Sequence, residues 1–173
     1  MTKSAAAVAF VAAFAILSAC AGPSGHMAMA GEAHPEASPY SESADAMADV
    51  DAALARASTS GKRVILVMGA NWCHDSRGLA GLFETPRFAA MLGPLYEIVY
   101  VDAGQPRADQ ATNMDVARRF GIENLIGTPN VFILSSSGER LNGEDDVLGW
   151  RDAASRDPDD VYDYFAGFAP DSD

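Results

Sequence analysis

Apolar residues are spaced along this chain in two different ways, one typical of strands and one typical of helices. Strand-like segments are found at Val64–Met68, Tyr96–Asp102 and Val131–Leu134, where apolar runs are rich in β-branched residues. Apolar residues with helical spacing occupy Ala44–Ala57 and recur after each of the first two strand-like segments. The pattern predicts strands that alternate with amphipathic helices.

Capping residues indicate where several of these helices begin and end. Thr85-Pro86 is expected to end one helix and start another, with threonine as the cap and proline in the first turn. That second helix is expected to end at Gly93-Pro94. Asn113 is expected to cap a later helix, and Asp157-Pro158 to begin the last one.

Three further segments have weaker patterns. Gly104–Ala111 is interpreted as a polar loop, and a short strand is expected near Glu139–Leu141 after a serine-rich turn. The acidic segment Asn142–Arg156, which contains Trp150, shows no clear period, and we make no prediction for it.

The N-terminus has the features of an export signal. Lys3 precedes the uncharged apolar run Ala5–Leu17, which is too short for a membrane span of ~20 residues. The following Leu17-Ser18-Ala19-Cys20 resembles the lipobox of bacterial lipoproteins, which implies removal of residues 1–19, lipidation of Cys20 and an extracytoplasmic, periplasm-facing location. Ala21 resembles the outer-membrane pattern. The alternative is an ordinary secretory signal, with Cys20 incidental.

Residues 20–43 are rich in Ala, Gly, Ser and Pro without a regular period, so we predict a flexible tether. An alternative role for this tether is copper binding, because imidazole and thioether groups suit copper. Its candidate ligands are His26, Met27, Met29 and His34. The folded domain is expected to span residues 44–168, and residues 169–173 to form a disordered tail.

Composition limits the classes of function. At 173 residues the chain allows one domain with appendages, and 24 acidic against 12 basic residues argue against nucleic acid as a partner. Cys20 and Cys73 could form at most one disulfide, and lipidation of Cys20 would leave Cys73 as the only thiol.

Cys73 lies where a predicted strand is followed by a predicted helix. Unpaired backbone N–H groups and the dipole at a helix N-terminus favour the thiolate form, and His74 and Arg77 would add to this effect, whereas Asp75 would oppose it. The alternative is a buried cysteine that packs as a small apolar side chain.

Two sequence motifs, and the distance between them along the chain, resemble those of the thioredoxin-like family. The first is Trp72-Cys73-x-x-Ser76, and the second is Gly127-Thr128-Pro129-Asn130, which follows Arg118–Ile122 and precedes an apolar strand. The resemblance covers residues 44–168 and implies a single α/β domain with a central mixed sheet flanked by helices. It also implies that Pro129 is cis beside Cys73, and that Thr128 and Pro129 bind substrate. Trp72 and His74, on either side of Cys73, are further candidates for substrate binding.

The chain departs from the family pattern at two positions. Ser76 stands where dithiol members have a second cysteine, and Val67 stands where many members have a buried aspartate that serves proton transfer. Ser76 can donate a hydrogen bond to the thiolate, but it cannot attack a mixed disulfide. A chain that does not resolve its own mixed disulfide has no need of that carboxylate.

Three classes of function remain open at this point. The first is a monothiol oxidoreductase or isomerase that acts on protein or small-molecule disulfides and is reset by an external thiol, such as glutathione or a partner thiol protein. The second is a thioredoxin-like binding module, and the third is a redox sensor in which Cys73 is oxidised. No bound cofactor is expected. A metal site or a Cys–His hydrolase is disfavoured because the predicted domain has one cysteine and one histidine, adjacent to each other.

Overall fold

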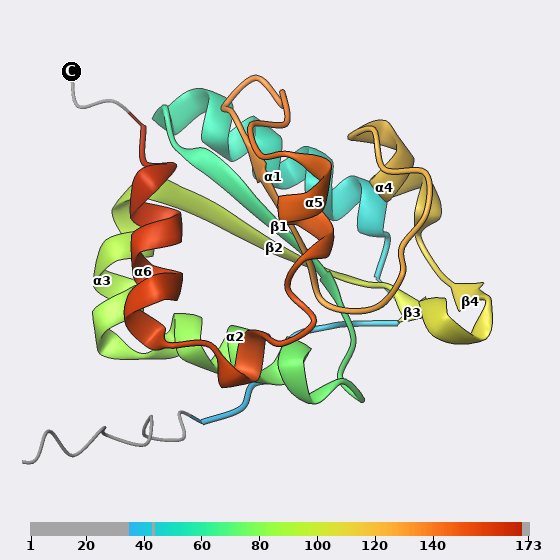
Figure 1. The fold of residues 1–173 in the computed structure, drawn as a ribbon. Coiled ribbons are helices and arrows are strands. Elements are labelled where there is room, and N and C mark those ends of the chain that lie inside the picture. Colours follow the sequence, from blue (N-terminus) through green and yellow to red (C-terminus); the bar gives the residue numbers. More distant parts are fainter. Residues whose placement is uncertain (1–34, 43, 171–173) are drawn as a thin grey trace, which may run out of the picture. The chain divides into compact units, whose positions relative to one another are not determined.

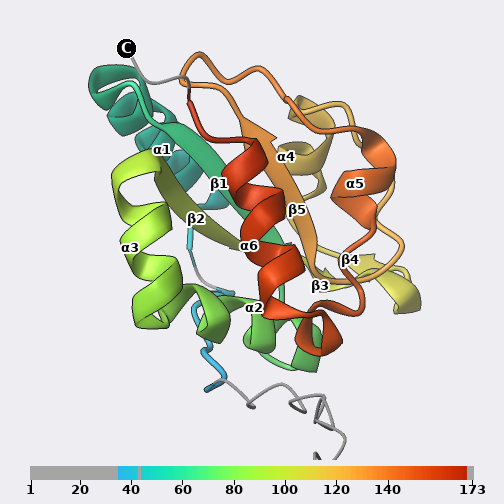
Figure 2. The same ribbon diagram turned by 60° about the vertical axis from the view of Figure 1, so that its left-hand side comes forward.

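The central sheet of the protein has β1 in its middle. In the computed structural model, which describes residues 35–42 and 44–170, β1 (Arg63–Gly69) pairs in parallel with β2 (Tyr96–Asp102) and antiparallel with β5 (Asn130–Leu134), as Figures 1 and 2 show. The three predicted strands are therefore confirmed. The predictions for the signal segment, Cys20 and the copper ligands fall outside the described residues.

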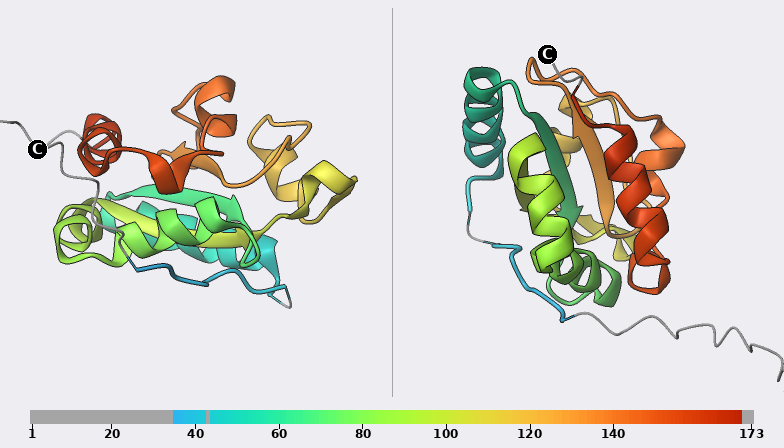
Figure 3. Two further views of the ribbon diagram at one scale, coloured as in Figure 1. Left: turned by 60° about the horizontal axis from the view of Figure 1, so that its bottom comes forward. Right: turned by 90° about the vertical axis from the view of Figure 1, so that its left-hand side faces the viewer.

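Alternation along β1 divides the core into two apolar layers. Val64, Leu66 and Met68 face one layer, and Ile65 and Val67 face the other. The first layer lies against α1 (Ala46–Ser60) and α4 (Met114–Arg119), and the second against α2 (His74–Glu84), α3 (Pro86–Leu95) and α6 (Pro158–Gly167). The right-hand view of Figure 3 shows α1 and α6 on opposite sides of the sheet. The predicted α/β class with helices on both faces is thus confirmed.

The helix α3 is longer than predicted. It continues through Gly93 and Pro94 to Leu95, although proline lacks the N–H that a helix interior uses. Pro94 stands in the last turn, so it removes one hydrogen bond at most. The extra turn lets Leu95 pack on the apolar layer that contains Leu92, and this burial outweighs the signal to stop.

Two predicted caps make different hydrogen bonds from those expected. Thr85 does stand between α2 and α3, but its hydroxyl donates backward to the carbonyl of Leu82 (2.7 Å) rather than capping α3. Asn113 precedes α4 without capping it, since its side-chain N–H donates to the carbonyl of Asp102 (2.8 Å). Asp157 caps α6 as predicted, accepting from the N–H of Asp159 (2.8 Å).

The segment predicted as a polar loop is a small hairpin. Its strands β3 (Gly104–Gln105) and β4 (Gln110–Ala111) pair antiparallel across a 3-10 turn, beyond the end of β2 in Figure 1. The carboxylate of Asp102 fastens the base of the hairpin by accepting from the N–H of Gly104 (2.9 Å) and the hydroxyl of Thr112 (3.0 Å).

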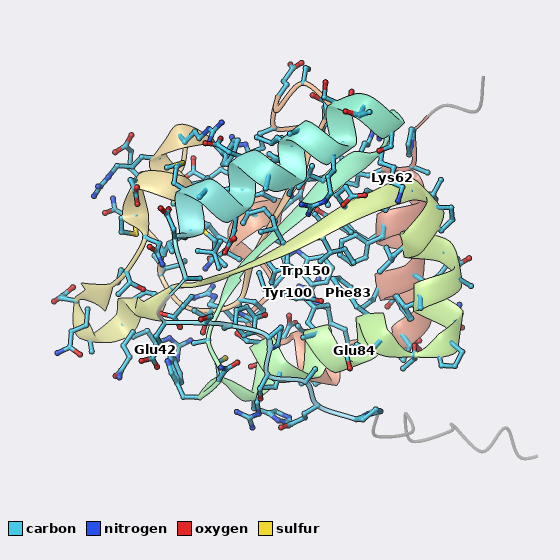
Figure 4. All side chains as sticks on the ribbon, turned by 180° about the vertical axis from the view of Figure 1, so that it is seen from behind. Glu42, Lys62, Phe83, Glu84, Tyr100 and Trp150 are labelled. Atoms are coloured by element: carbon cyan, nitrogen blue, oxygen red, sulfur yellow. The ribbon has the colours of Figure 1, made fainter. Side chains whose placement is uncertain are left out.

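The acidic segment 142–156 contains α5 (Glu144–Leu148) and a 3-10 turn at Ala153–Ser155. Trp150 between them is almost fully buried and packs against Tyr164 in α6, with ring centroids 4.9 Å apart. Figure 4 labels Trp150, Phe83 and Tyr100 in the interior of the domain. The expected strand near Glu139–Leu141 is reduced to one bridge, between Leu134 and Arg140.

Residues 35–42, predicted to be part of a flexible tether, instead pack on the domain, and we call them the N-terminal strap. Figure 4 shows this strap crossing the α2 side of the molecule towards Glu42. Tyr40 is 2% exposed, and its backbone exchanges two hydrogen bonds with the Asn71 side chain, at 3.1 and 2.6 Å. The Tyr40 hydroxyl donates to the carbonyl of Ser76 (3.2 Å), and burial raises the pKa of this phenol well above its usual value.

The strap lies so close to α2 that a side chain at Gly81 would displace it. A Cβ atom there would be 1.5 Å from the carbonyl oxygen of Pro35. We expect Gly81→Ala to break the hydrogen bond from Ala37 N–H to Arg77 carbonyl (3.1 Å) and to speed amide exchange in residues 35–40, measured by mass spectrometry.

Gly93→Ala is the matched control, because Gly93 also lies in a helix but a Cβ atom there would have no neighbouring atom within 4 Å. Both substitutions gain up to about 1 kcal/mol of helix propensity, so only Gly81→Ala should loosen the strap. Unchanged exchange in residues 35–40 after Gly81→Ala would contradict the packing described.

Candidate active site

Cys73 stands at the junction between β1 and α2, where the sequence places it. It is the N-cap residue of α2, with extended backbone, and its carbonyl accepts the first helical hydrogen bond from Arg77 N–H (3.0 Å). Its side chain does not cap the helix but points to the carbonyl oxygen of Thr128, 3.5 Å from Sγ. The residue is only 8% exposed, so the thiol is reached through a pocket rather than from an open surface.

Strand pairing brings Thr128 to Cys73. Met68 near the end of β1 lies opposite Asn130 at the start of β5, so the loop before β5 meets the loop after β1. The Thr128-Pro129 peptide bond is cis, as the family resemblance implies. Thr128 is 5% exposed, and its hydroxyl has no hydrogen-bond partner among the described residues.

The thiol opens into a pocket of about 260 Å³. It is built by the junction after β1, the hairpin, the loop before β5 and the segment after α5. The lining residues are Trp72, Cys73, His74, Asp75, Pro106, Arg107, Gly127, Thr128 and Arg151. Four predicted site residues, Trp72, Cys73, His74 and Thr128, are thus brought together, whereas Ser76 and Pro129 are buried and do not line the pocket.

Trp72 separates this pocket from a second hollow of about 530 Å³, lined partly by the hairpin and by Glu42 of the strap. The indole is 54% exposed, and its N–H donates to the carbonyl of Gly104 (3.0 Å). This bond holds the ring against the hairpin, so Trp72 forms a wall between the two hollows.

His74 and Arg77 share a partner that the sequence-based expectation did not include. Glu36 of the strap binds both of them, at 2.5 Å to His74 Nδ1 and 2.6 Å to Arg77 Nε. Hydrogen bonds from Arg77, and then from His74, lower the pKa of the Glu36 carboxyl. The Glu36 carboxylate thus places a negative charge beside both side chains.

Ser76 makes no hydrogen bond to Cys73 in the structure. The residue is fully buried on α2, and its hydroxyl has no partner among the described residues. Val67, in place of an aspartate, is fully buried in β1 among apolar side chains. The surroundings of Cys73 thus offer neither a second thiol nor a buried carboxylate at these two positions.

Arg107, Arg151 and Pro106 line the pocket but were missed by sequence reasoning, whereas Gly127 belongs to a motif of the family resemblance. Arg107 belongs to the segment interpreted as a loop, and Arg151 to the segment without a prediction. No local motif marks either residue, because only the tertiary fold brings these segments to Cys73.

Two negative findings apply to the described part of the chain. It contains no group of three or more His, Cys, Asp or Glu residues that could hold a metal ion. None of its helices is both long enough and apolar enough to cross a membrane.

Comparisons with known proteins agree with this architecture. Residues 45–136 match the family model described as thioredoxin-like. The structure is also similar to the crystal structure of a disulphide isomerase from Xylella fastidiosa Temecula1, with 30% sequence identity and a TM-score of 0.65. That match covers 76% of this chain and 96% of the isomerase chain. A search of curated proteins found no match.

Proposed function

Because this chain belongs to the thioredoxin-like family, we propose that it carries out thiol–disulfide exchange through Cys73 alone. The proposal is carried by one combination of features. A thiol lies in a pocket at a helix N-terminus, and position 76 holds a buried serine instead of a second thiol. Cys73 is the only cysteine of the described residues, so a second internal thiol is not at hand there. The similarity to a disulphide isomerase supports the same class of chemistry.

The first step is attack of the Cys73 thiolate on a disulfide. A bond forms between Cys73 Sγ and one substrate sulfur, the substrate S–S bond breaks, and the second sulfur leaves as a thiolate that takes a proton from solvent. The unpaired N–H groups at the start of α2 favour the attacking thiolate. The product is a mixed disulfide between the protein and one half of the substrate.

An external thiol must complete the cycle. Its thiolate attacks the mixed disulfide, bonds to one of the two sulfurs and releases Cys73 as a thiolate when it attacks the substrate sulfur. Ser76 cannot take this role, because a serine hydroxyl does not attack the sulfur of a disulfide. The substrate half then leaves as a new mixed disulfide, or as a rearranged disulfide when the second thiol belongs to the same substrate.

The two steps can be separated in an experiment on the reduced full-length chain. We expect the neutral probe bis(2-hydroxyethyl) disulfide to form an adduct at Cys73, visible by intact mass and peptide mapping. After removal of the probe the adduct should persist, and millimolar glutathione should release it. Absence of an adduct, or its decay without added thiol, would refute the monothiol mechanism.

Exposed apolar residues beside the pocket support a polypeptide as one class of partner. Among the described residues, the exposed large apolar side chains are Trp72 and Ile126, at 54% and 48% exposure. Trp72 lines the pocket, and Ile126 stands two residues before Thr128. The same surface favours a second candidate function, a binding module that holds a partner at this groove without turnover.

We also propose that the domain is tethered outside the cytoplasm by lipidated Cys20, since the lipobox-like sequence directly follows an apolar signal core. Residues 35–42 pack on the domain, so this part of the predicted tether is not free of it. Pro35 lies against Gly81 of α2, so the tether would leave from the α2 side of the domain.

Replacing Cys20 with alanine tests the anchor. The wild-type protein should sediment with membranes and require detergent for release, whereas Cys20→Ala should be soluble or retain its uncleaved signal. Cell fractionation and intact mass give both readouts. A wild-type protein that is soluble after lysis without detergent would refute the lipid anchor.

A further inference from the structure

Two arginines at the Cys73 pocket lack any partner within the described part of the chain. Arg107 and Arg151 make neither an ion pair nor a hydrogen bond there. Every other arginine of that part is bound to a carboxylate or a carbonyl oxygen. These are Arg56, Arg63, Arg77, Arg87, Arg118, Arg119, Arg140 and Arg156.

The two free side chains converge on the loop that carries Thr128. A Cβ atom at Gly127 would lie 2.8 Å from Cδ of Arg151 and 3.4 Å from Nε of Arg107. The missing side chain at Gly127 therefore leaves room for both arginines, which reach this point from the hairpin and from the segment after α5. Thr128, whose carbonyl contacts the thiol, is the next residue.

The charge at this pocket contrasts with that of the whole chain. The full sequence has a net charge of −12, yet the pocket contains two guanidinium groups without carboxylate partners. Asp75 is the one carboxylate that lines the pocket, and it already accepts a hydrogen bond from Ala154 N–H (3.1 Å). His74 is bound to Glu36, so it adds little to the balance.

We propose that Arg107 and Arg151 form an anion subsite that selects carboxylate-bearing small thiols and disulfides for reaction at Cys73. Guanidinium groups bind carboxylates through paired hydrogen bonds, and a bound anion would relieve the repulsion between two neighbouring cations. A volume of about 260 Å³ suits a small molecule rather than a folded partner. This inference rests on the proposed thiol–disulfide exchange and names the class of its substrate or resetting thiol.

The reaction is the same exchange with a charged leaving group. The Cys73 thiolate bonds to one sulfur of a dicarboxylate disulfide, the S–S bond breaks, and the departing thiolate takes a proton from solvent. The arginines bind a carboxylate of the substrate, either on the half that becomes bonded to Cys73 or on the half that departs as a thiol. They take no part in the transfer of electrons.

Three disulfide probes of similar size test the proposal on the full-length protein. They are the anionic 3,3′-dithiodipropionate, the neutral bis(2-hydroxyethyl) disulfide and the cationic cystamine. Rates of adduct formation at Cys73 are measured by mass and divided by the rates of the same probes with N-acetylcysteine. We expect the order anionic, neutral, cationic, and a fall in the anionic-to-neutral ratio as salt is raised.

Neutral glutamine variants assign the preference to the two side chains. Arg107→Gln and Arg151→Gln should each lower the anionic-to-neutral ratio by roughly fivefold, the scale of one exposed charge pair, and the double variant should lower it further. Arg118→Gln is the matched control, because Arg118 is also an exposed arginine but pairs with Glu123 away from the pocket residues. Its ratio should equal that of the wild type.

The outcomes separate this inference from the proposed function. If the neutral probe reacts with Cys73 but the ratio is the same in wild type and double variant, the anion subsite is wrong and the exchange chemistry stands. If no probe reacts with Cys73, the proposed function fails and this inference fails with it. A ratio that falls equally in Arg118→Gln would assign the preference to net charge and overturn the subsite.

Discussion

Replacing Ser76 with cysteine is expected to turn the protein into a dithiol reductase, with protein-disulfide reduction faster by at least about tenfold at millimolar external thiol. The second thiol would attack the mixed disulfide within the same molecule. Such intramolecular steps are much faster than attack by a separate molecule, because the reacting atoms are already held together. Turbidity of reduced insulin, followed with and without glutathione, measures the change.

The structure accommodates this substitution at low cost. Ser76 is fully buried in the first turn of α2, three residues after Cys73, which is the N-cap of that helix. Its hydroxyl has no partner in the described residues, so the exchange of oxygen for sulfur breaks no hydrogen bond there. Val67 still provides no buried carboxylate to accept a proton, which should keep the gain below that of a natural dithiol site.

Ser76→Ala is the control, because it removes the same hydroxyl without adding a thiol. It should show no rise in insulin reduction. On mild oxidation, Ser76→Cys should lose two hydrogens by intact mass and form a disulfide between Cys73 and the introduced thiol. An oxidised variant that keeps two free thiols would show that the two positions do not meet.

The sequence predicts the strands of the sheet well because their evidence is local. Val64–Met68, Tyr96–Asp102 and Val131–Leu134 differ from the observed strands by at most one residue at each end. The position of Cys73 at the start of a helix was predictable for the same reason, because the local sequence pattern indicates it. The mixed sheet and the approach of the Pro129 loop to Cys73 came from the family resemblance, since no local pattern encodes strand pairing.

The strap and the charges around the pocket were not predictable in this way. Tyr40 stands in a segment whose composition is typical of a tether, and its burial depends on Asn71 and on two glycines, Gly69 and Gly81, that leave room for the strap. Glu36 of the strap then binds both His74 and Arg77. The sequence-based prediction considered only neighbours along the chain. It therefore expected these two side chains to stabilise the Cys73 thiolate and could not include Glu36 as their partner.

Cys73→Ser is expected to abolish the covalent intermediate completely, and this result separates the two candidate functions. A serine hydroxyl does not attack disulfides, so no adduct with bis(2-hydroxyethyl) disulfide should form, while the small change from sulfur to oxygen should leave the pocket shape intact. Exchange requires the thiol. A binding module requires only the exposed apolar surface that includes Trp72 and Ile126.

Capture of extracytoplasmic proteins by immobilised wild type and Cys73→Ser, each eluted first with salt and then with dithiothreitol, distinguishes the two. Exchange predicts partners in the dithiothreitol fraction of the wild type that are absent from the variant. Equal recovery from both proteins, all of it in the salt fraction, would favour the binding module. Trp72→Ala, which keeps the thiol but removes an exposed wall of the pocket, should then lose the salt-eluted partners, because their contact area depends on that indole.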